Sequence, residues 1–244
     1  MNKLYFVGNQ IGNYGDIGQR AKLMIENAAM VVYENDKEFN EQIKSWNILP
    51  KGKLVQHIQD EELFEEIAQT LTDDGDVALI ADYGYPIIAD MGHPLGRYIL
   101  DKGLEVSIIA GPSISSTANV IALLPNWVQN FLFQEFMQFE NPYIEQKLET
   151  MKDLNYNLVM IDRPKRIHAT IDLMAKVFGE DRNAALLTDL TKNGGLPEVF
   201  RGTLAEVVKK MKYIDPVMKY IDVAIVVEGI PDPLRALSEQ SSTV

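Results

Sequence analysis

Short apolar segments alternate with longer amphipathic segments along most of the chain. The longer segments carry apolar residues three and four positions apart, as Leu63, Ile67 and Leu71 do, and this spacing predicts α-helices. Several short segments are uninterrupted runs of valine, isoleucine and leucine, which are typical of strands covered on both faces. The strands predicted in this way span residues 4–7, 30–33, 54–57, 77–82, 106–110, 131–136, 158–162, 184–189, 198–201 and 223–228.

This alternation of strands and helices predicts an α/β fold with largely parallel sheets. The Gly-Pro pair at 111–112 is followed by a segment rich in serine and threonine, and it marks the predicted domain boundary. We therefore expect two α/β domains with five strands each, one over residues 1–111 and one over residues 112–230. The proline-broken polar residues 231–244 are predicted to form a loosely held tail.

Composition and charge limit the functional classes. The 244 residues are 46% hydrophobic, include no cysteine, and carry a formal net charge of −12. Without cysteine there is no disulfide and no thiol nucleophile, and His57, His93 and His168 are too far apart in sequence to suggest a metal site. The negative charge disfavours a broad, nonspecific nucleic-acid binder, although it allows a local basic patch. No apolar run approaches the ~20 residues of a membrane helix, and no signal peptide is evident, so we expect a cytoplasmic protein without a membrane partner.

Three loops follow predicted strands, at the edge where open α/β sheets bind ligands. Residues 8–18 contain four glycines, but their spacing matches neither the dinucleotide-binding fingerprint nor a P-loop. Residues 82–94 combine aspartate, glycine and proline, so that N–H groups and carboxylates can meet a ligand there. Residues 110–117 begin a helix whose N-terminus can face an anion. Each loop is equally compatible with an ordinary turn or helix cap.

Taken in order, these loops resemble the motifs of the tetrapyrrole-methylase superfamily of S-adenosylmethionine (SAM) dependent methyltransferases. The resemblance is strongest to the branch that methylates the 2′-hydroxyl of a cytidine in ribosomal RNA. The stretch GNQIGNYGDIGQRA is similar to P-T-P-I-G-N-L-G-D-I followed by R-A, ADYGYPIIADMG to S-D-A-G-T-P-x-I-x-D-P-G, and IAGPS to L-P-G-P-S. Further along, FQEF, DLTK, RGTL and VEG are similar to F-x-G-F, E-L-T-K, R-G-T-L and V-E-G. The similarity runs from about residue 4 to residue 229.

The resemblance implies two α/β domains with SAM in the cleft between them, a homodimer, and RNA as the methyl acceptor, with 16S ribosomal RNA in the small subunit as the specific case. The residues that match positions in contact with the cofactor are Gln10, Asp82, Tyr83, Gly84, Ile87, Ser113, Ile114, Phe133, Gln134, Leu187 and Ala224. The residues expected at the acceptor are Asn13, Tyr85, Arg163, Lys165 and Arg166. The three cations of this set are compatible with an RNA phosphate and also with pairing to carboxylates.

Methyl transfer to a ribose hydroxyl requires the reacting atoms to be held in line, and it needs a group that accepts the hydroxyl proton. No metal is required for this chemistry. The carboxylates that we expect as candidates for the base are Asp82, Glu34 and Asp90. Each of them is also compatible with a structural role as a hydrogen-bond acceptor.

Departures from the family motifs leave other functions open. Tyr83-Gly84-Tyr85 stands where the family has A-G-T, and Leu187 brings a bulky side chain to the expected adenine pocket. One alternative is a non-catalytic SAM-binding or regulatory protein that has kept the fold. Another is a methyltransferase that acts on a small molecule or a peptide. A nicotinamide-dependent oxidoreductase is disfavoured because the G-x-G-x-x-G fingerprint is missing.

Overall fold

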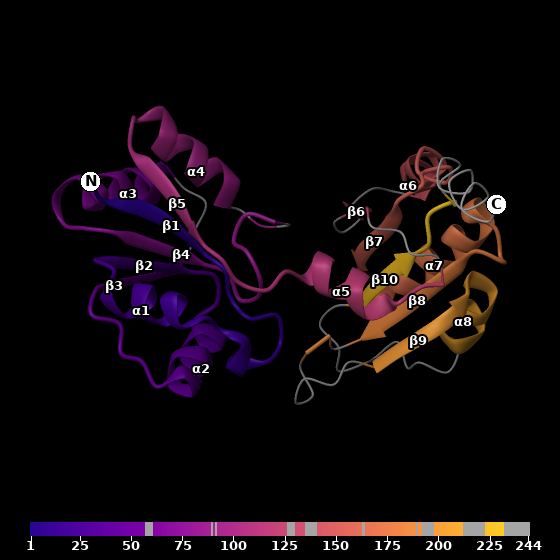
Figure 1. Cartoon of the computed structure of the whole chain (residues 1–244). Helices are drawn as coiled ribbons and strands as arrows, with labels where there is room; N and C mark the ends of the chain where they lie inside the picture. The colour runs from indigo at the N-terminus through magenta and orange to yellow at the C-terminus, as the bar shows by residue number, and fades with distance from the viewer. Residues whose placement is uncertain are drawn as a thin grey trace, which may run out of the picture. The chain divides into compact units, whose positions relative to one another are not determined.

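The protein forms two compact units, Met1–Ile114 and Ser115–Val244, each built on a five-stranded sheet (Figure 1). The computed structural model describes residues 1–56, 61–88, 90, 92–125, 130–134, 141–162, 164–188, 190–191, 198–211 and 223–231. The helices are α1 (Gln19–Asn27), α2 (Asp36–Trp46), α3 (Glu61–Asp73), α4 (Gly92–Asp101), α5 (Ile114–Ala122), α6 (Asn141–Glu149), α7 (Pro164–Phe178), α8 (Leu204–Met211) and the 3₁₀ helix η1 (Tyr14–Asp16). The strands are β1 (Lys3–Val7), β2 (Met30–Tyr33), β3 (Lys53–Gln56), β4 (Val77–Ile80), β5 (Glu105–Ile109), β6 (Phe131–Gln134), β7 (Asn157–Asp162), β8 (Asn183–Thr188), β9 (Glu198–Thr203) and β10 (Val223–Val227).

The predicted α/β class is confirmed, and each predicted strand has a counterpart within two residues of its bounds. The first unit ends at Ile114, close to the boundary expected at residues 111–112. Residues 232–244, which make up nearly all of the predicted tail, lie outside the described residues.

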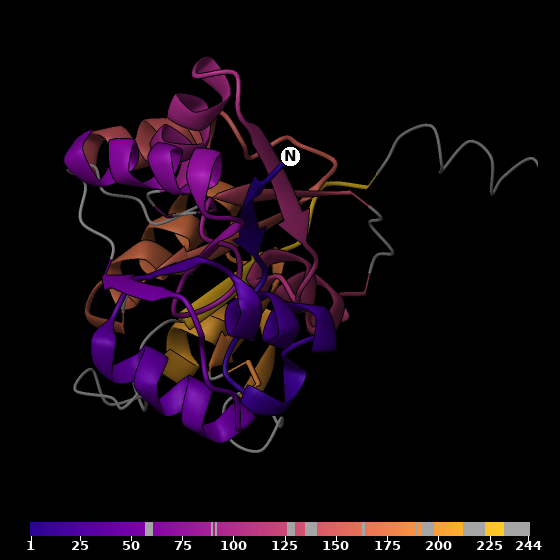
Figure 2. The same ribbon diagram turned by 90° about the vertical axis from the view of Figure 1, so that its left-hand side faces the viewer.

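The first sheet is parallel throughout, with the strand order β3-β2-β4-β1-β5. Side chains that alternate along its strands separate into two apolar layers. Val7 and Ile80 pack with residues of α1 and α2, whereas Phe6 and Leu79 pack with residues of α3 and α4. Helices therefore cover both faces of this sheet, as Figures 1 and 2 show. Continuous apolar strands are expected in such a sheet because neither face meets water.

The connections that follow β1 and β4 lead toward opposite edges of the sheet. From β1 it passes through α1 to β2, and from β4 it passes through α4 to β5 on the other side of β1. Because crossovers between parallel strands are right-handed, these two connections run over opposite faces of the sheet. The carboxyl ends of β1 and β4 thus form a topological switch point, which is where open α/β sheets bind ligands.

The expectation of largely parallel sheets is wrong for the second sheet, whose order is β6-β7-β10-β8-β9. Only the β6–β7 pair is parallel there, and the β7–β10, β10–β8 and β8–β9 pairs are antiparallel. An uninterrupted apolar run reports burial on both faces of a sheet, and it carries no information on the direction of the neighbouring strand. The connection between β8 and β9 spans residues 189–197, which are fewer than the roughly twelve residues that a parallel crossover needs. This short connection is consistent with the antiparallel pairing of the two strands.

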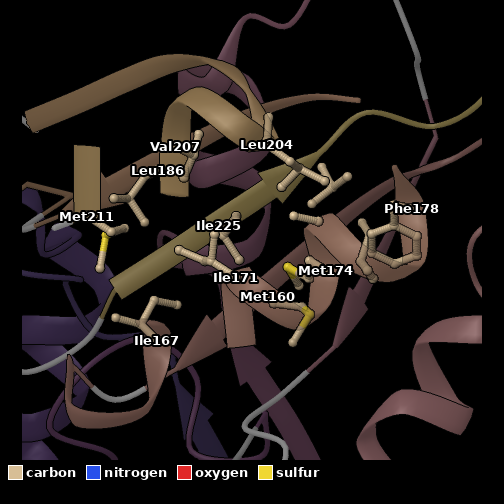
Figure 3. Close-up of a cluster of buried hydrophobic side chains, with 14 of the residues drawn as sticks. Met160, Ile167, Ile171, Met174, Phe178, Leu186, Leu204, Val207, Met211 and Ile225 are labelled. Carbon is tan, nitrogen blue, oxygen red and sulfur yellow. The ribbon is translucent and has the colours of Figure 1, made fainter. Parts of the chain in front are cut away.

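One face of the second sheet packs against α7 and α8 (Figure 3). Met160, Leu186 and Ile225 come from three neighbouring strands and meet Ile171 of α7 and Leu204 of α8. All five side chains are at most 2% exposed. Burial of apolar area stabilises a fold by about 25 cal/mol per Å², so this layer is a main source of stability for the second unit.

Two of the motifs behind the family resemblance stabilise the second unit. In RGTL, the Arg201 guanidinium donates at 2.5 and 2.6 Å to the last two carbonyl groups of α5. In the same motif, the Thr203 N–H donates to Glu206 Oε2 at 2.9 Å, and Thr203 Oγ1 accepts from the Glu206 N–H at 3.3 Å. This reciprocal capping box begins α8. In VEG, the buried Glu228 carboxylate accepts from Asn183 Nδ2 at 2.7 Å.

Candidate active site

At the switch point, main-chain hydrogen bonds join the loop after β1 to the loop after β4 and to the last residue of β5. The Asn9 N–H donates to the Gly84 carbonyl at 2.7 Å, and the Gly84 N–H donates to the Gln10 carbonyl at 3.0 Å. The Gly8 N–H donates to the Ile109 carbonyl at 2.8 Å. Three segments that are far apart in the sequence therefore form one group of loops within the first unit.

The glycines in these loops allow the loops to approach one another. A Cβ atom on Gly8 would lie 2.6 Å from the Gly111 nitrogen, and a Cβ atom on Gly111 would lie 2.5 Å from the Gly8 oxygen. Gly84 has a φ of 70°, in the left-handed region that favours glycine. Gly8 and Gly111 thus permit a close contact between two loops, and Gly84 permits a backbone conformation that other residues disfavour.

Asn9 and Gln42, which the sequence analysis did not assign to the site, hold the loop after β4. Both are buried, with exposures of 0% and 1%. Asn9 Nδ2 lies 3.0 Å from Gln42 Oε1 and 2.8 and 2.9 Å from the first two carbonyl oxygens of the loop, while Gln42 Nε2 donates to the Asp82 carbonyl at 2.7 Å. A signal was present for Gln42, because it shares the buried face of α2 with Phe39 and Trp46. A polar residue at such a core position needs a partner.

Acidic side chains surround Asp82, the second residue after β4. The Asp82 N–H donates to Glu34 Oε2 at 3.0 Å. Burial, and then the negative charges of Glu34 and Glu38, raise the pKa of the Asp82 carboxyl to about 7; a hydrogen bond from the Asn35 main chain opposes this rise, and Asp90 adds a smaller contribution to it. A carboxyl with this pKa can both accept and release a proton near neutral pH. Among the three carboxylates expected as candidates for the base, Asp82 therefore has a pKa that suits proton transfer near neutral pH.

Glu38 on α2 links the aromatic side chains of this site and was also missed by the sequence analysis. Its carboxylate accepts from the Tyr14 hydroxyl at 3.2 Å, and it accepts from the Tyr83 hydroxyl as well. Burial and the charge of Glu38 raise the pKa of Tyr14 to about 12 and raise the pKa of Tyr83 well above its usual range. Both phenols therefore stay protonated at neutral pH and act as donors.

Gln10 places a buried donor among the loops. Its side chain is fully buried, and its Oε1 accepts from the Gly12 N–H. Its Nε2 meets no acceptor among the residues that the structure describes. A buried amide donor without a partner costs about 1–3 kcal/mol. Such a donor is suited to an oxygen acceptor on a ligand.

The other residues expected in the first unit take several positions. Asn13 caps η1, with its side-chain oxygen accepting at 2.9 Å from the N–H two residues later. Tyr85 bonds the main chain of Gly111 through its hydroxyl group, at 2.9 and 3.0 Å. Among the remaining expected residues, Ile87 is exposed on the loop after β4, Ser113 lies partly buried on the loop after β5, and Ile114 begins α5 and is partly buried.

In the second unit, the expected residues lie at or near strand ends. Phe133 and Gln134 end β6 and are partly buried. Leu187 of β8 and Ala224 of β10 are cross-strand neighbours, exposed by 0% and 3%. The hydroxyl of Thr188 is buried and has no partner within the described part of the chain. The structure thus brings Leu187 and Ala224 together, and their contact with a cofactor stays a prediction.

Arg166 pairs with a carboxylate, one of the two roles left open for the cationic residues. Its Nη2 and Nε donate to Oδ1 of the buried Asp162 at 2.7 and 3.1 Å. Thr170 donates its hydroxyl to the other oxygen of Asp162 at 2.6 Å. Arg163 and the side chain of Lys165 lie outside the described residues, so their expected role stays a prediction.

The loops of the first unit therefore combine a proton acceptor, a negatively charged surrounding and a buried donor. This set suits a ligand that carries positive charge together with polar oxygens, and it suits a reaction that moves a proton. Across the described ranges, acidic and histidine side chains form no group of three placed to hold a metal ion. Within the same ranges, no helix has the length and apolar character to span a bilayer.

This chain is similar to a known protein family and to several known methyltransferases. The family model described as Tetrapyrrole (Corrin/Porphyrin) Methylases matches residues 3–208. A protein of Halalkalibacterium halodurans named Ribosomal RNA small subunit methyltransferase I is 28% identical over 205 residues, which are 84% of this chain and 69% of that protein. Its namesake in Thermotoga maritima is 26% identical over 216 residues, 88% and 95% of the two chains. The structure of uroporphyrin-III-C-methyltransferase from Thermus thermophilus matches with a TM-score of 0.62 at 16% identity, over 93% of this chain and 94% of that one.

Proposed function

We propose that this chain, which belongs to the tetrapyrrole (corrin/porphyrin) methylase family and is a SAM-dependent methyltransferase, transfers a methyl group to a ribose 2′-hydroxyl of RNA. Support for RNA as the acceptor comes from relatives named Ribosomal RNA small subunit methyltransferase I. The observation that carries the chemistry is the Asp82 carboxyl, held in the loop after β4 with a pKa of about 7. The proposal includes 16S ribosomal RNA as the acceptor and a homodimer, as the resemblance implies, together with the cytoplasmic location expected from the sequence.

The loops of the first unit fit SAM. Because SAM carries positive charge on its sulfur and its amino group, the carboxylates of Glu34, Glu38 and Asp82 provide a favourable surrounding. The buried Nε2 of Gln10 offers a donor to a ribose or carboxylate oxygen of the cofactor. In this proposal Gln10, the 82–84 main chain and the Tyr83 side chain hold the cofactor from the first unit. When bound, SAM supplies a methyl group that is open to attack by a nucleophile.

In the proposed mechanism, Asp82 accepts the proton of the attacking ribose hydroxyl. A hydroxyl that keeps its proton is a weak nucleophile, so a base within hydrogen-bond reach raises the rate. Glu38 accepts hydrogen bonds from the hydroxyls of Tyr14 and Tyr83. Its negative charge also opposes ionisation of Asp82, so that the Asp82 carboxyl takes up a proton near neutral pH. Alignment of the reactants by fixed loops can supply about 7–11 kcal/mol of the barrier reduction.

Methyl transfer from labelled SAM tests the proposal. The purified protein is incubated with SAM labelled on the methyl group and with 16S ribosomal RNA, either free or in small ribosomal subunits. The RNA is then digested to nucleosides, and the labelled nucleosides are identified by mass spectrometry. We expect label in a 2′-O-methylated nucleoside, because the proposed base acts on a ribose hydroxyl.

Two results would contradict the proposed acceptor. One is a protein that binds SAM but labels no RNA under any of these conditions. The other is label that enters a base atom, a peptide or a small molecule in place of the ribose.

A further inference from the structure

We propose that Tyr85 is a positioning residue that fastens the loop after β4 to the loop after β5. Its hydroxyl donates to the Gly111 carbonyl at 3.0 Å and accepts from the Gly111 N–H at 2.9 Å. A single hydroxyl thereby satisfies both polar main-chain groups of Gly111. We call this pair of hydrogen bonds the Tyr85 clasp. The inference rests on the SAM dependence stated above, and it does not depend on RNA being the acceptor.

The clasp closes a ring of contacts among the three loops. Gly111 lies against Gly8 so closely that neither residue has room for a Cβ atom. The loop that contains Gly8 is in turn bonded to Gly84, through the Asn9 N–H and the Gly84 carbonyl. These two contacts are made by main-chain atoms, whereas the third contact, from residue 85 to residue 111, is made by a side chain. A substitution of Tyr85 can therefore open the ring without changing the other two contacts.

The clasp fixes the main chain at the point where the residues after Gly111 begin. Because both of its polar groups are engaged, the peptide planes on either side of Gly111 are fixed in orientation. Ser113 and Ile114, which the resemblance assigns to SAM, come directly after this fixed point. The family motif has threonine where this chain has Tyr85, and the longer side chain of tyrosine makes the link here. We therefore expect the clasp to organise the SAM-binding main chain before the cofactor arrives, which increases affinity.

The inference is tested with Tyr85→Phe, which removes the hydroxyl and keeps the ring. Affinity for SAM and for S-adenosylhomocysteine is measured by calorimetry on the full chain. We expect the Kd of Tyr85→Phe to rise about tenfold, a change on the scale of the one or two neutral hydrogen bonds lost. The matched control is Tyr98→Phe, which removes a hydroxyl that bonds Glu65 on an exposed part of the same unit. Its Kd is expected to stay within about twofold of wild type, since no loop of the site loses a contact.

Amide hydrogen exchange gives a second readout that needs no ligand, and its first part uses the wild-type protein alone. The clasp requires the Gly111 N–H of the SAM-free wild-type protein to be protected from exchange. In Tyr85→Phe, exchange at residues 109–113 is expected to accelerate, with the strands of the first sheet unchanged. An unprotected Gly111 amide in the wild-type protein would overturn the inference even if the variant failed to fold.

The outcomes separate this inference from the proposed function. If wild-type protein binds SAM and Tyr85→Phe binds it equally well, the clasp has no positioning role and the proposed function stands. If Tyr85→Phe loses affinity while wild-type protein labels no RNA, the clasp is supported and the proposed acceptor is wrong. If wild-type protein binds no SAM, both fail.

Discussion

Asp82→Asn is expected to slow methyl transfer by about 10²- to 10⁴-fold, the range that a general base contributes. The substitution keeps the shape of the side chain and removes its capacity to accept a proton. The loop is expected to stay in place, because Glu34 and Gln42 hold it through the main-chain N–H and carbonyl of residue 82. The measurement is a single-turnover rate at saturating SAM. Calorimetry with S-adenosylhomocysteine shows separately whether cofactor binding has changed.

The pH dependence of the wild-type enzyme is expected to report the same group. Since burial and neighbouring charges raise the pKa of Asp82 to about 7, the carboxyl is mostly protonated below that pH and cannot accept a proton. We expect kcat/KM to fall about tenfold for each pH unit below about 7, and to level above it. In Asp82→Asn this acidic limb disappears.

Asp76→Asn is the matched control for both measurements. Asp76 lies at the amino end of β4, opposite the site, where its carboxylate accepts from the Lys3 N–H at 2.9 Å. The control removes the same formal charge, and its rate and pH profile are expected to match wild type. An Asp82→Asn enzyme that kept the wild-type rate and the acidic limb would show that another group accepts the proton.

Gly8→Ala is expected to lower the free energy of unfolding by about 1–3 kcal/mol, the usual cost of overpacking, and to weaken SAM binding. The added Cβ would lie 2.6 Å from the Gly111 nitrogen and 2.9 Å from the Ile109 oxygen. Main-chain atoms cannot rotate away as a side chain can, so the loops after β1 and β5 must separate. Urea denaturation and calorimetry with SAM measure the two effects.

Gly18→Ala is the control for this prediction. Gly18 has a φ of −71°, and the nearest atom to an added Cβ is the Ala110 oxygen at 4.0 Å. Its substitution is expected to cost less than about 1 kcal/mol, since only a helix N-cap preference changes. Equal denaturation midpoints for the two variants would contradict the close contact of Gly8 with Gly111.

The fold could be predicted from the sequence wherever local pattern determines the element. Residues 77–80 and 223–227 could be predicted as strands because these runs are short and uniformly apolar, and they lack the three-and-four spacing of an amphipathic helix. Strand direction in the second sheet could not be predicted from these runs, since burial on both faces is common to parallel and antiparallel strands. The overlooked signal is in the sequence between β8 and β9, where Asn193-Gly194-Gly195 is typical of chain reversal.

The site could be predicted less completely, because its chemistry depends on contacts between distant residues. Asp82 was identified by its position after a buried strand, but its raised pKa requires Glu34 and Glu38 from other segments. The expected contact of Tyr85 with the methyl acceptor stays a prediction, and the bond of its hydroxyl to a residue 26 positions away could not be foreseen from the sequence. For Arg166 the sequence left an RNA phosphate and a carboxylate open as partners, and the structure pairs it with Asp162, four positions earlier on the chain, where helical spacing brings it within reach.

The central claim is that the loops after β1, β4 and β5 hold SAM in the first unit. The most direct measurement is amide hydrogen exchange of the wild-type protein with and without saturating SAM. The expected result is slower exchange in peptides that cover residues 8–12, 82–88 and 109–113. Bound SAM that left exchange in all three segments unchanged would contradict the claim.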